Sequence, residues 1–178
     1  KPEPGKITGG YRPLVAFDRK ESYSDEQVRA LWNADLPGCF GPAFAGLALN
    51  NPPCLPSGRL KLFDRILEVD PKGGRFGLGS VRAEADVHPD DWFLTCHFVD
   101  DKVMPGTLMY ECCAYSLRFL LFRMGWVGEC DQVTYEPLLD RGAALRCRGP
   151  VDVTSKKVVY EVEIKEIGYG PEPYVITD

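Results

Sequence analysis

The stretch from Thr107 to Met124 constrains the fold more than any other part of the chain. It is the most apolar segment of the sequence, interrupted only by Glu111, Arg118 and Arg123. A membrane-spanning helix needs roughly 20 consecutive apolar residues, so we predict a helix buried inside a soluble protein and closed by Gly125 as a left-handed cap. Such a helix must be covered by other elements on nearly all sides.

Segments in which apolar and polar residues alternate lie before and after this helix in the sequence, and they predict the strands that cover it. Between Arg75 and Val87, small apolar residues alternate with charged ones, which is the period of a half-buried strand. The other expected strands are 60–69, 132–136, 143–153, 157–167 and the start of one at 174–177. We therefore predict an α+β fold, an antiparallel sheet wrapped around one long central helix.

In the N-terminal third of the chain, the sequence patterns that predict helices and strands are weaker. Residues 1–23 are rich in Pro, Gly and charge and are expected to be irregular. Ser24 and Gln27 have the spacing of a capping box, which predicts a helix to about Asn33. Five prolines predict a loop from Leu36 to Gly58. We expect one domain over 1–178, with 1–58 as an N-terminal extension and 59–178 as its core.

Charge and cysteine content exclude several classes of protein. The formal net charge is −5, the pI is about 5.1, and no basic stripe is present, so a nucleic-acid binder is not expected. Seven scattered cysteines do not suggest disulfides or a zinc site. We expect a reducing compartment, the cytoplasm. The chain starts without Met or a signal-peptide pattern, which we interpret as a cut from something longer.

Only two histidines are present, so His-dependent chemistry has few candidates. His88 stands in a strand-ending turn and is expected to be an exposed loop residue. His97 lies in an aromatic and apolar run, just ahead of the turn Met104-Pro105-Gly106. On its sequence context alone, His97 is either a hydrogen-bonded core histidine or a base in a poorly solvated site.

Glu111 falls about one turn into the apolar helix, where an unpaired carboxylate would cost several kcal/mol. It is either an ion-pair partner of another core cation or of Arg118, which lies about 10 Å further along the axis, or a group that delivers a proton. Gly106 opens the same helix. Its N–H could polarise a carbonyl at the positive end of the helix dipole, or the glycine could simply form a tight turn.

Signatures of other enzyme classes are missing from the sequence. It has no GxSxG elbow, Walker loop, HExxH or dinucleotide fingerprint. Cys96 and Cys112 are expected to be small core residues rather than activated thiolates.

The segment from Trp92 to Glu111 resembles the active-site signature of the 3-hydroxyacyl-ACP dehydratases of fatty acid synthesis. It keeps His97, a Met-Pro-Gly ending nine positions later at Gly106, and an acid fourteen positions later at Glu111. Residues 17–168 are similar to the dehydratase/isomerase branch, and residues 168–175 are similar to dehydratase domains of polyunsaturated fatty acid synthases.

The resemblance implies a hot-dog fold and a role for each residue. His97 would remove the proton at C2, Glu111 would protonate the leaving C3 hydroxyl, and the Gly106 N–H would hold the thioester oxygen. Tyr115, which stands where the family has Gln, and Cys96 are candidates for supporting the pair. The resemblance implies no metal and no redox cofactor.

It also implies partners. The substrate would be an acyl chain linked to the phosphopantetheine of an acyl carrier protein, and a second hot-dog unit, from a homodimer or a fused domain, would bring another Glu111 to His97. The last long strand of the family fold is expected to be missing after Asp178. Two alternatives stay open: a catalytically inactive hot-dog binding domain, and a hot-dog thioesterase.

Overall fold

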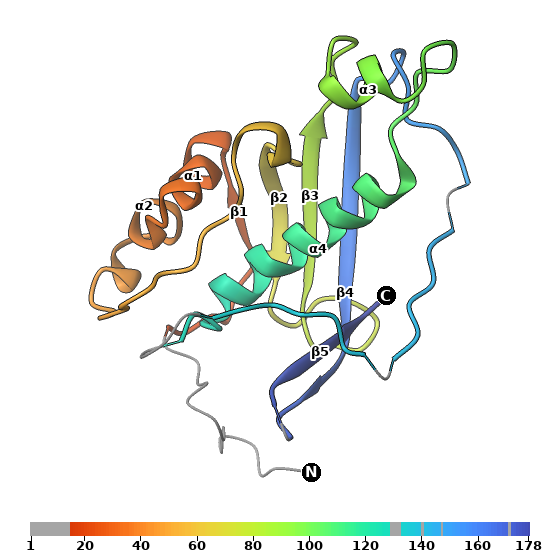
Figure 1. The fold of residues 1–178 in the computed structure, drawn as a ribbon. Helices are drawn as coiled ribbons and strands as arrows, with labels where there is room; N and C mark the ends of the chain where they lie inside the picture. Colours follow the sequence, from red (N-terminus) through yellow and green to blue (C-terminus); the bar gives the residue numbers. More distant parts are fainter. Residues whose placement is uncertain (1–14, 129–132, 140, 147, 171) are drawn as a thin grey trace.

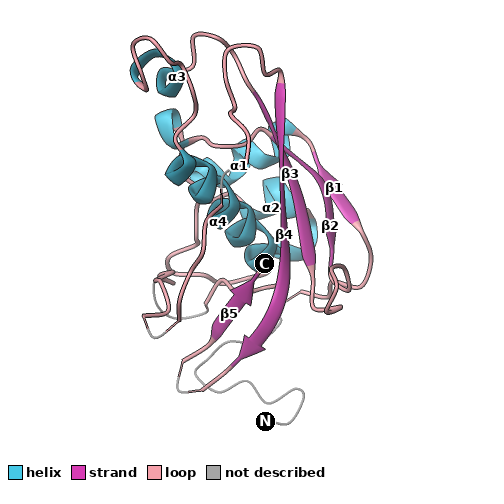
Figure 2. Cartoon of the chain, turned by 90° about the vertical axis from the view of Figure 1, so that its right-hand side faces the viewer, coloured by secondary structure: helices cyan, strands magenta, loops and turns pink. Residues whose placement is uncertain are grey.

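A five-stranded antiparallel sheet and one long helix form the two layers of the protein. The structure is a computed structural model that describes residues 15–128, 133–139, 141–146, 148–170 and 172–178. The strands follow the order of the sequence, β1 (Glu21–Tyr23), β2 (Arg65–Asp70), β3 (Ser80–Asp86), β4 (Lys157–Gly168) and β5 (Tyr174–Thr177). All helices lie on one face of this sheet (Figures 1 and 2). The predicted α+β arrangement is confirmed.

The two central strands show why the alternating segments form a sheet. In β3, Val81 and Ala83 are fully buried while Arg82 between them is exposed. Across the ladder, Val81 faces Val162 and Ala83 faces Tyr160, which are also buried. The apolar residues therefore share one face because side chains alternate along a strand, and that face meets the helix.

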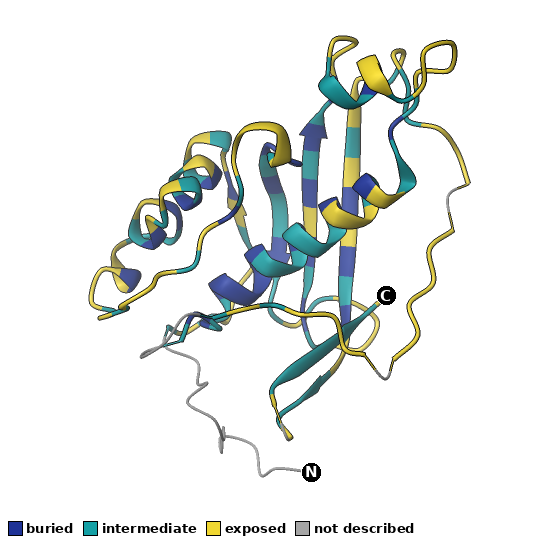
Figure 3. Cartoon of the chain, in the orientation of Figure 1, coloured by how far each residue is buried: buried dark blue, intermediate teal, exposed yellow. Residues whose placement is uncertain are grey.

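The long helix α4 (Gly106–Arg123) is buried unevenly along its length. In its C-terminal half every residue from Phe119 to Arg123 is buried, as the sequence predicted. In its N-terminal half only the positions four apart, Leu108, Cys112 and Ser116, are buried, and the opposite side is open (Figure 3). The expectation of a helix covered on nearly all sides is therefore correct for one half only.

The N-terminal region contains more regular structure than its sequence indicated. The capping box of Ser24 and Gln27 is confirmed and begins α1 (Asp25–Ala30), which continues as the 3-10 turn η1 (Leu31–Asn33). The predicted loop from Leu36 is wrong at its start, where α2 (Leu36–Phe40) forms. The reason is a cap: the Asp35 carboxylate accepts from the Gly38 N–H at 2.9 Å, and a proline suits a first helical turn.

The shorter elements of this region are two further 3-10 turns, η2 (Pro42–Phe44) and η3 (Gly58–Leu60). Residues 21–23, expected to be irregular, form the edge strand β1 against β2. The start of the predicted strand 60–69 is also wrong, since β2 begins at Arg65.

Two predicted strands are absent from the described residues. Residues 133–136 and the described part of 143–153 run without strand pairing, apart from a single bridge between Val103 and Asp152. A strand requires a neighbouring backbone to pair with. On the side of β4 away from β3, β5 pairs only from Ile164 onward, so the first part of this edge of β4 has no strand beside it, and the described residues of 143–153 do not pair with it.

A buried ion pair fastens the N-terminal region to the end of α4. The Arg123 guanidinium donates to Glu21 at 2.6 and 2.8 Å and to the Tyr23 hydroxyl at 3.0 Å. It also lies over the rings of Phe17 and Phe44.

In the described part of the chain, no helix is long and apolar enough to cross a membrane.

Candidate active site

His97 is fixed at the end of a short helix by bonds that close a loop. It caps α3 (Trp92–Cys96), with its N–H donating to the Phe93 carbonyl at 3.2 Å. The Val103 N–H donates back to the His97 carbonyl, and the His97 Nδ1 lies 2.9 Å from the Val103 carbonyl oxygen. A carbonyl can only accept, so Nδ1 carries a proton, and in the neutral imidazole Nε2 then has the lone pair. The imidazole is half-buried and lies against the Phe98 ring, with the ring centroids 3.9 Å apart and the ring planes tilted by 31°.

The short helix α3 is itself held in place from two sides. The Trp92 indole donates to the Arg59 carbonyl at 2.9 Å, which joins α3 to η3. Leu94 is fully buried and anchors the helix to the core. The aromatic and apolar run that contains His97 forms this short helix, and His97 lies at the end of the helix, in a position that the rest of the fold determines.

The start of α4 follows directly from this loop. Met104 donates its N–H to the Val151 carbonyl at 2.8 Å, Pro105 is the N-cap, and Gly106 is the first helical residue. The first N–H groups of a helix have no intrahelical acceptor and carry the positive end of its dipole. Gly106 therefore presents a backbone donor at the surface of the site.

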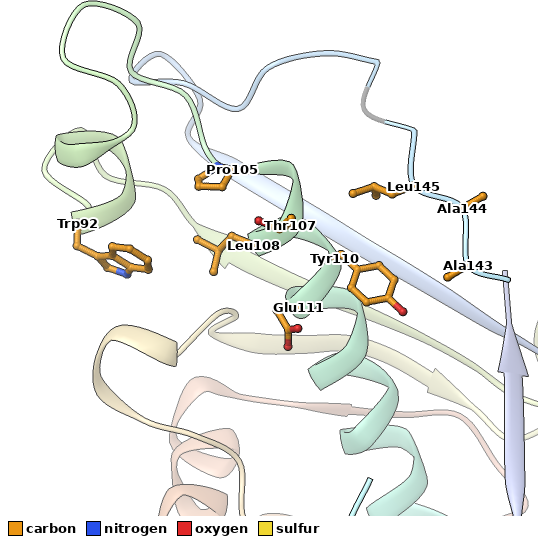
Figure 4. Close-up of a pocket in the computed structure, with 9 residues that line it drawn as sticks. All are labelled: Trp92, Pro105, Thr107, Leu108, Tyr110, Glu111, Ala143, Ala144 and Leu145. Atoms are coloured by element: carbon orange, nitrogen blue, oxygen red, sulfur yellow. The ribbon is translucent and has the colours of Figure 1, made fainter. Parts of the chain in front are cut away.

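A pocket of about 540 Å³ opens beside this helix start (Figure 4). Its lining residues are Trp92, Pro105, Thr107, Leu108, Tyr110, Glu111, Ala143, Ala144 and Leu145. Seen from the open side of α4, the Glu111 carboxylate is directed away from the Tyr110 hydroxyl, which points to Ala143. Among the described residues that line it, Glu111 has the only charged side chain, and the rest of the lining is mostly apolar.

Glu111 is less enclosed than the sequence suggested. The expected site among apolar neighbours is wrong for the single chain, because Glu111 falls on the open side of α4 and is exposed. No ion pair with Arg118 is formed among the described residues; the Arg118 guanidinium lies over the rings of Tyr115 and Tyr135 instead. The alternative of a structural Glu111–Arg118 pair is therefore not supported.

His97 does not line the pocket that holds Glu111 in this single chain. The fold places Glu111 close to the start of α4. His97 lies at the other end of the loop that leads into that helix. His88 is exposed, as expected, and its backbone N–H donates to the Asp91 carboxylate at 2.8 Å.

The supporting candidates divide into buried and exposed groups. Cys112 is fully buried, and burial raises the pKa of its thiol to about 12, so it is a protonated core residue as expected. Cys96 is exposed, so the expectation that it packs in the core is wrong, and its sulfur lies 3.9 Å from the Phe93 carbonyl. Tyr115 is half-buried, with its ring beneath the Arg118 guanidinium at 4.9 Å.

Sequence reasoning missed one wall of the pocket. Residues 143–145 come from a stretch distant in sequence, and nothing in their composition marks them as lining a site. Tyr110 and Thr107 could have been found, because residues three apart on a helix share a face. Within the described ranges, no three His, Cys, Asp or Glu side chains are grouped so that they could hold a metal ion.

Comparison with known proteins shows a family and a relative to which this chain is similar. The model of a FabA-like domain matches residues 55–178. The chain is also 30% identical over 161 residues to a protein from Thraustochytrium sp. that is named as one of the subunits of a polyunsaturated fatty acid synthase. That similarity covers 89% of this chain, but the chain spans only 11% of that relative.

Proposed function

This chain belongs to the FabA-like family of hot-dog dehydratases, and from that premise we propose that it dehydrates 3-hydroxyacyl thioesters to trans-2-enoyl thioesters in fatty acid or polyunsaturated fatty acid synthesis. The observation that carries the proposal is the Glu111 carboxylate in a mostly apolar pocket beside the N-terminus of α4. The match of residues 55–178 to the family supports it.

In this proposal His97 is the base and Glu111 the acid. The Nε2 lone pair of His97, left free because Nδ1 donates to the Val103 carbonyl, takes the proton from C2. Glu111 gives its proton to the C3 hydroxyl, which leaves as water. The Gly106 N–H stabilises the negative charge that develops on the thioester oxygen.

A second hot-dog unit, from a second copy or a fused domain, would complete the site. Two apolar side chains that directly follow His97 and two that line the pocket are exposed: Phe98 by 56%, Val99 by 82%, Tyr110 by 48% and Leu145 by 51%. Apolar groups gathered at a surface are typical of an interface. A unit docked here would cover Glu111 and exclude water, and would bring a His97 to a Glu111 of the other unit.

The carrier and the domain organisation complete the proposal. The thioester would be presented by the phosphopantetheine of an acyl carrier protein, in the cytoplasm. Residues 1–58 would be an N-terminal extension of a single hot-dog domain that has its core at 59–178.

Hydration of a crotonyl thioester, the reverse reaction, tests this function. Loss of the enoyl absorbance with retention of the thioester is expected. Release of free thiol would instead identify a hot-dog thioesterase. Absence of both reactions from folded protein that includes its second unit would favour an inactive binding domain.

A further inference from the structure

The pocket wall opposite α4 belongs to a basic stretch of an acidic chain. Residues 141–151 contain Arg141, Arg146 and Arg148 and no carboxylate, although the chain carries a formal charge of −5. All three side chains are exposed. Two other exposed arginines are paired with carboxylates, Arg29 with Asp25 and Arg75 with Glu163. For the three arginines of this stretch, no ion pair is found within the residues that the structure describes.

These arginines do not line the pocket themselves but flank its wall at 143–145 in the chain, and we call this flanking stretch the rim. Arg146 follows the lining residue Leu145 directly, Arg148 is three residues beyond it, and Arg141 is two residues before Ala143. At 3.8 Å between consecutive Cα atoms, their backbones are within about 11 Å of the lining residues. Inside, the one charge that the described lining residues carry is the carboxylate of Glu111, which repels anions. An anionic group is therefore favoured at the rim and disfavoured within.

We propose that Arg146 and Arg148, with Arg141 beside them, bind the phosphate of the arm that carries the acyl thioester. This inference rests on the proposed function. A pantetheine arm has roughly the length of five extended residues, about 17 Å, whereas Pro105 to Glu111 spans about 9 Å of helix. A phosphate at the rim therefore leaves enough arm to place the thioester beside Gly106. Guanidinium groups suit this task because they bind phosphate oxygens bidentately.

Two substrates that differ only in the phosphate provide the test. Hydration is measured with crotonyl-pantetheine and with crotonyl-phosphopantetheine, and the phosphorylated substrate should have the lower KM. Arg146→Gln and Arg148→Gln should each raise that KM about tenfold, as expected for the loss of a charged hydrogen bond, and leave kcat and the KM for crotonyl-pantetheine unchanged. Arg82→Gln removes one exposed charge from β3 and should change neither KM.

The outcomes separate this inference from the function on which it rests. Equal KM values for the two substrates in the unmodified protein, or an equal rise of both KM values in the variants, would overturn the proposal that the arginines bind the phosphate. Neither result would contradict the dehydratase function. If neither substrate is hydrated, the proposed function fails. Calorimetric titration with phosphopantetheine and with pantetheine then tests phosphate binding without turnover. Tighter binding of phosphopantetheine, lost in Arg146→Gln and Arg148→Gln, would support phosphate binding by these arginines. Equal affinity for the two compounds would overturn it.

Discussion

The two residues proposed to move protons have separate tasks, so each can be removed alone. His97→Ala removes the base for C2, and a positioned acid or base typically contributes about 10²- to 10⁴-fold to a rate. Enoyl hydration should therefore fall by at least about 10²-fold. Glu111→Gln keeps the shape of the side chain but has no proton to transfer, and a similar loss is expected. Steady-state kinetics on folded protein, checked by circular dichroism, measures both.

The double variant and a distant histidine are the controls for that experiment. Because the two groups act in one coupled transfer, His97→Ala with Glu111→Gln should be little slower than either single variant. His88→Ala changes an exposed side chain outside the pocket and should leave the rate nearly unchanged. Near-normal turnover by His97→Ala would contradict the assignment of the base.

Among the elements, β1 and α4 are coupled through the ion pair of Glu21 with Arg123. Burial raises the pKa of Glu21, but the hydrogen bonds from Arg123 and Tyr23 outweigh burial and hold the pKa below its usual value of 4.5. A carboxyl with a lowered pKa in the folded state stabilises the protein above the unfolded-state pKa, and this stabilisation is lost as pH falls through the folded-state pKa. We expect the free energy of unfolding to drop below about pH 4.5.

Glu21→Gln tests this origin of the acid sensitivity. The variant should be less stable than the unmodified protein at pH 7, because the buried Arg123 loses its counter-charge. The difference should shrink as the pH falls below 4.5 and be lost once the pH passes through the lowered folded-state pKa of Glu21, where this carboxyl becomes protonated in the folded protein. Urea unfolding across this pH range measures both curves. Parallel curves would assign the acid sensitivity to other carboxylates.

The buried half of α4 carries much of the packing between the helix and its surroundings. The Phe119 ring has no exposed surface and contacts the rings of Tyr23, Phe40 and Phe63 edge-on or nearly so. Phe119→Ala should cost about 3–5 kcal/mol of unfolding free energy, since the cavity would lie in the middle of the core. Tyr110→Ala, on the open side of the same helix, should cost much less. Urea denaturation of the two variants gives the comparison.

The elements that could be predicted from sequence are those with a periodic signal. The alternation in β3 and β4, the capping box before α1 and the apolar run of α4 all determine their own structure locally. The strand expected at 143–153 fails for a different reason. Pairing depends on which backbone lies alongside, and a run of apolar residues does not contain that information.

At the scale of the whole molecule, the sequence could identify the candidate residues but not their surroundings. The spacing from His97 to Glu111 locates both groups, because the motif and helix are local. The exposure of Glu111 could not be foreseen: its burial depends on what covers the open half of α4, and no element of the single chain does so within the described residues. The pocket wall at 143–145 likewise arises only from the tertiary fold.

In the proposed function the site is completed by a second unit, and two inactive variants test this. If His97 of one copy works with Glu111 of another, a mixed dimer of His97→Ala and Glu111→Gln has one site that lacks both groups and one that keeps both. Random exchange makes half of the dimers mixed, so about a quarter of the normal activity should return when the two variants are unfolded and refolded together. Each variant refolded alone should stay inactive. Failure to recover activity, from a wild-type protein that regains its own after the same treatment, would show that the pair is not assembled between two copies of this chain.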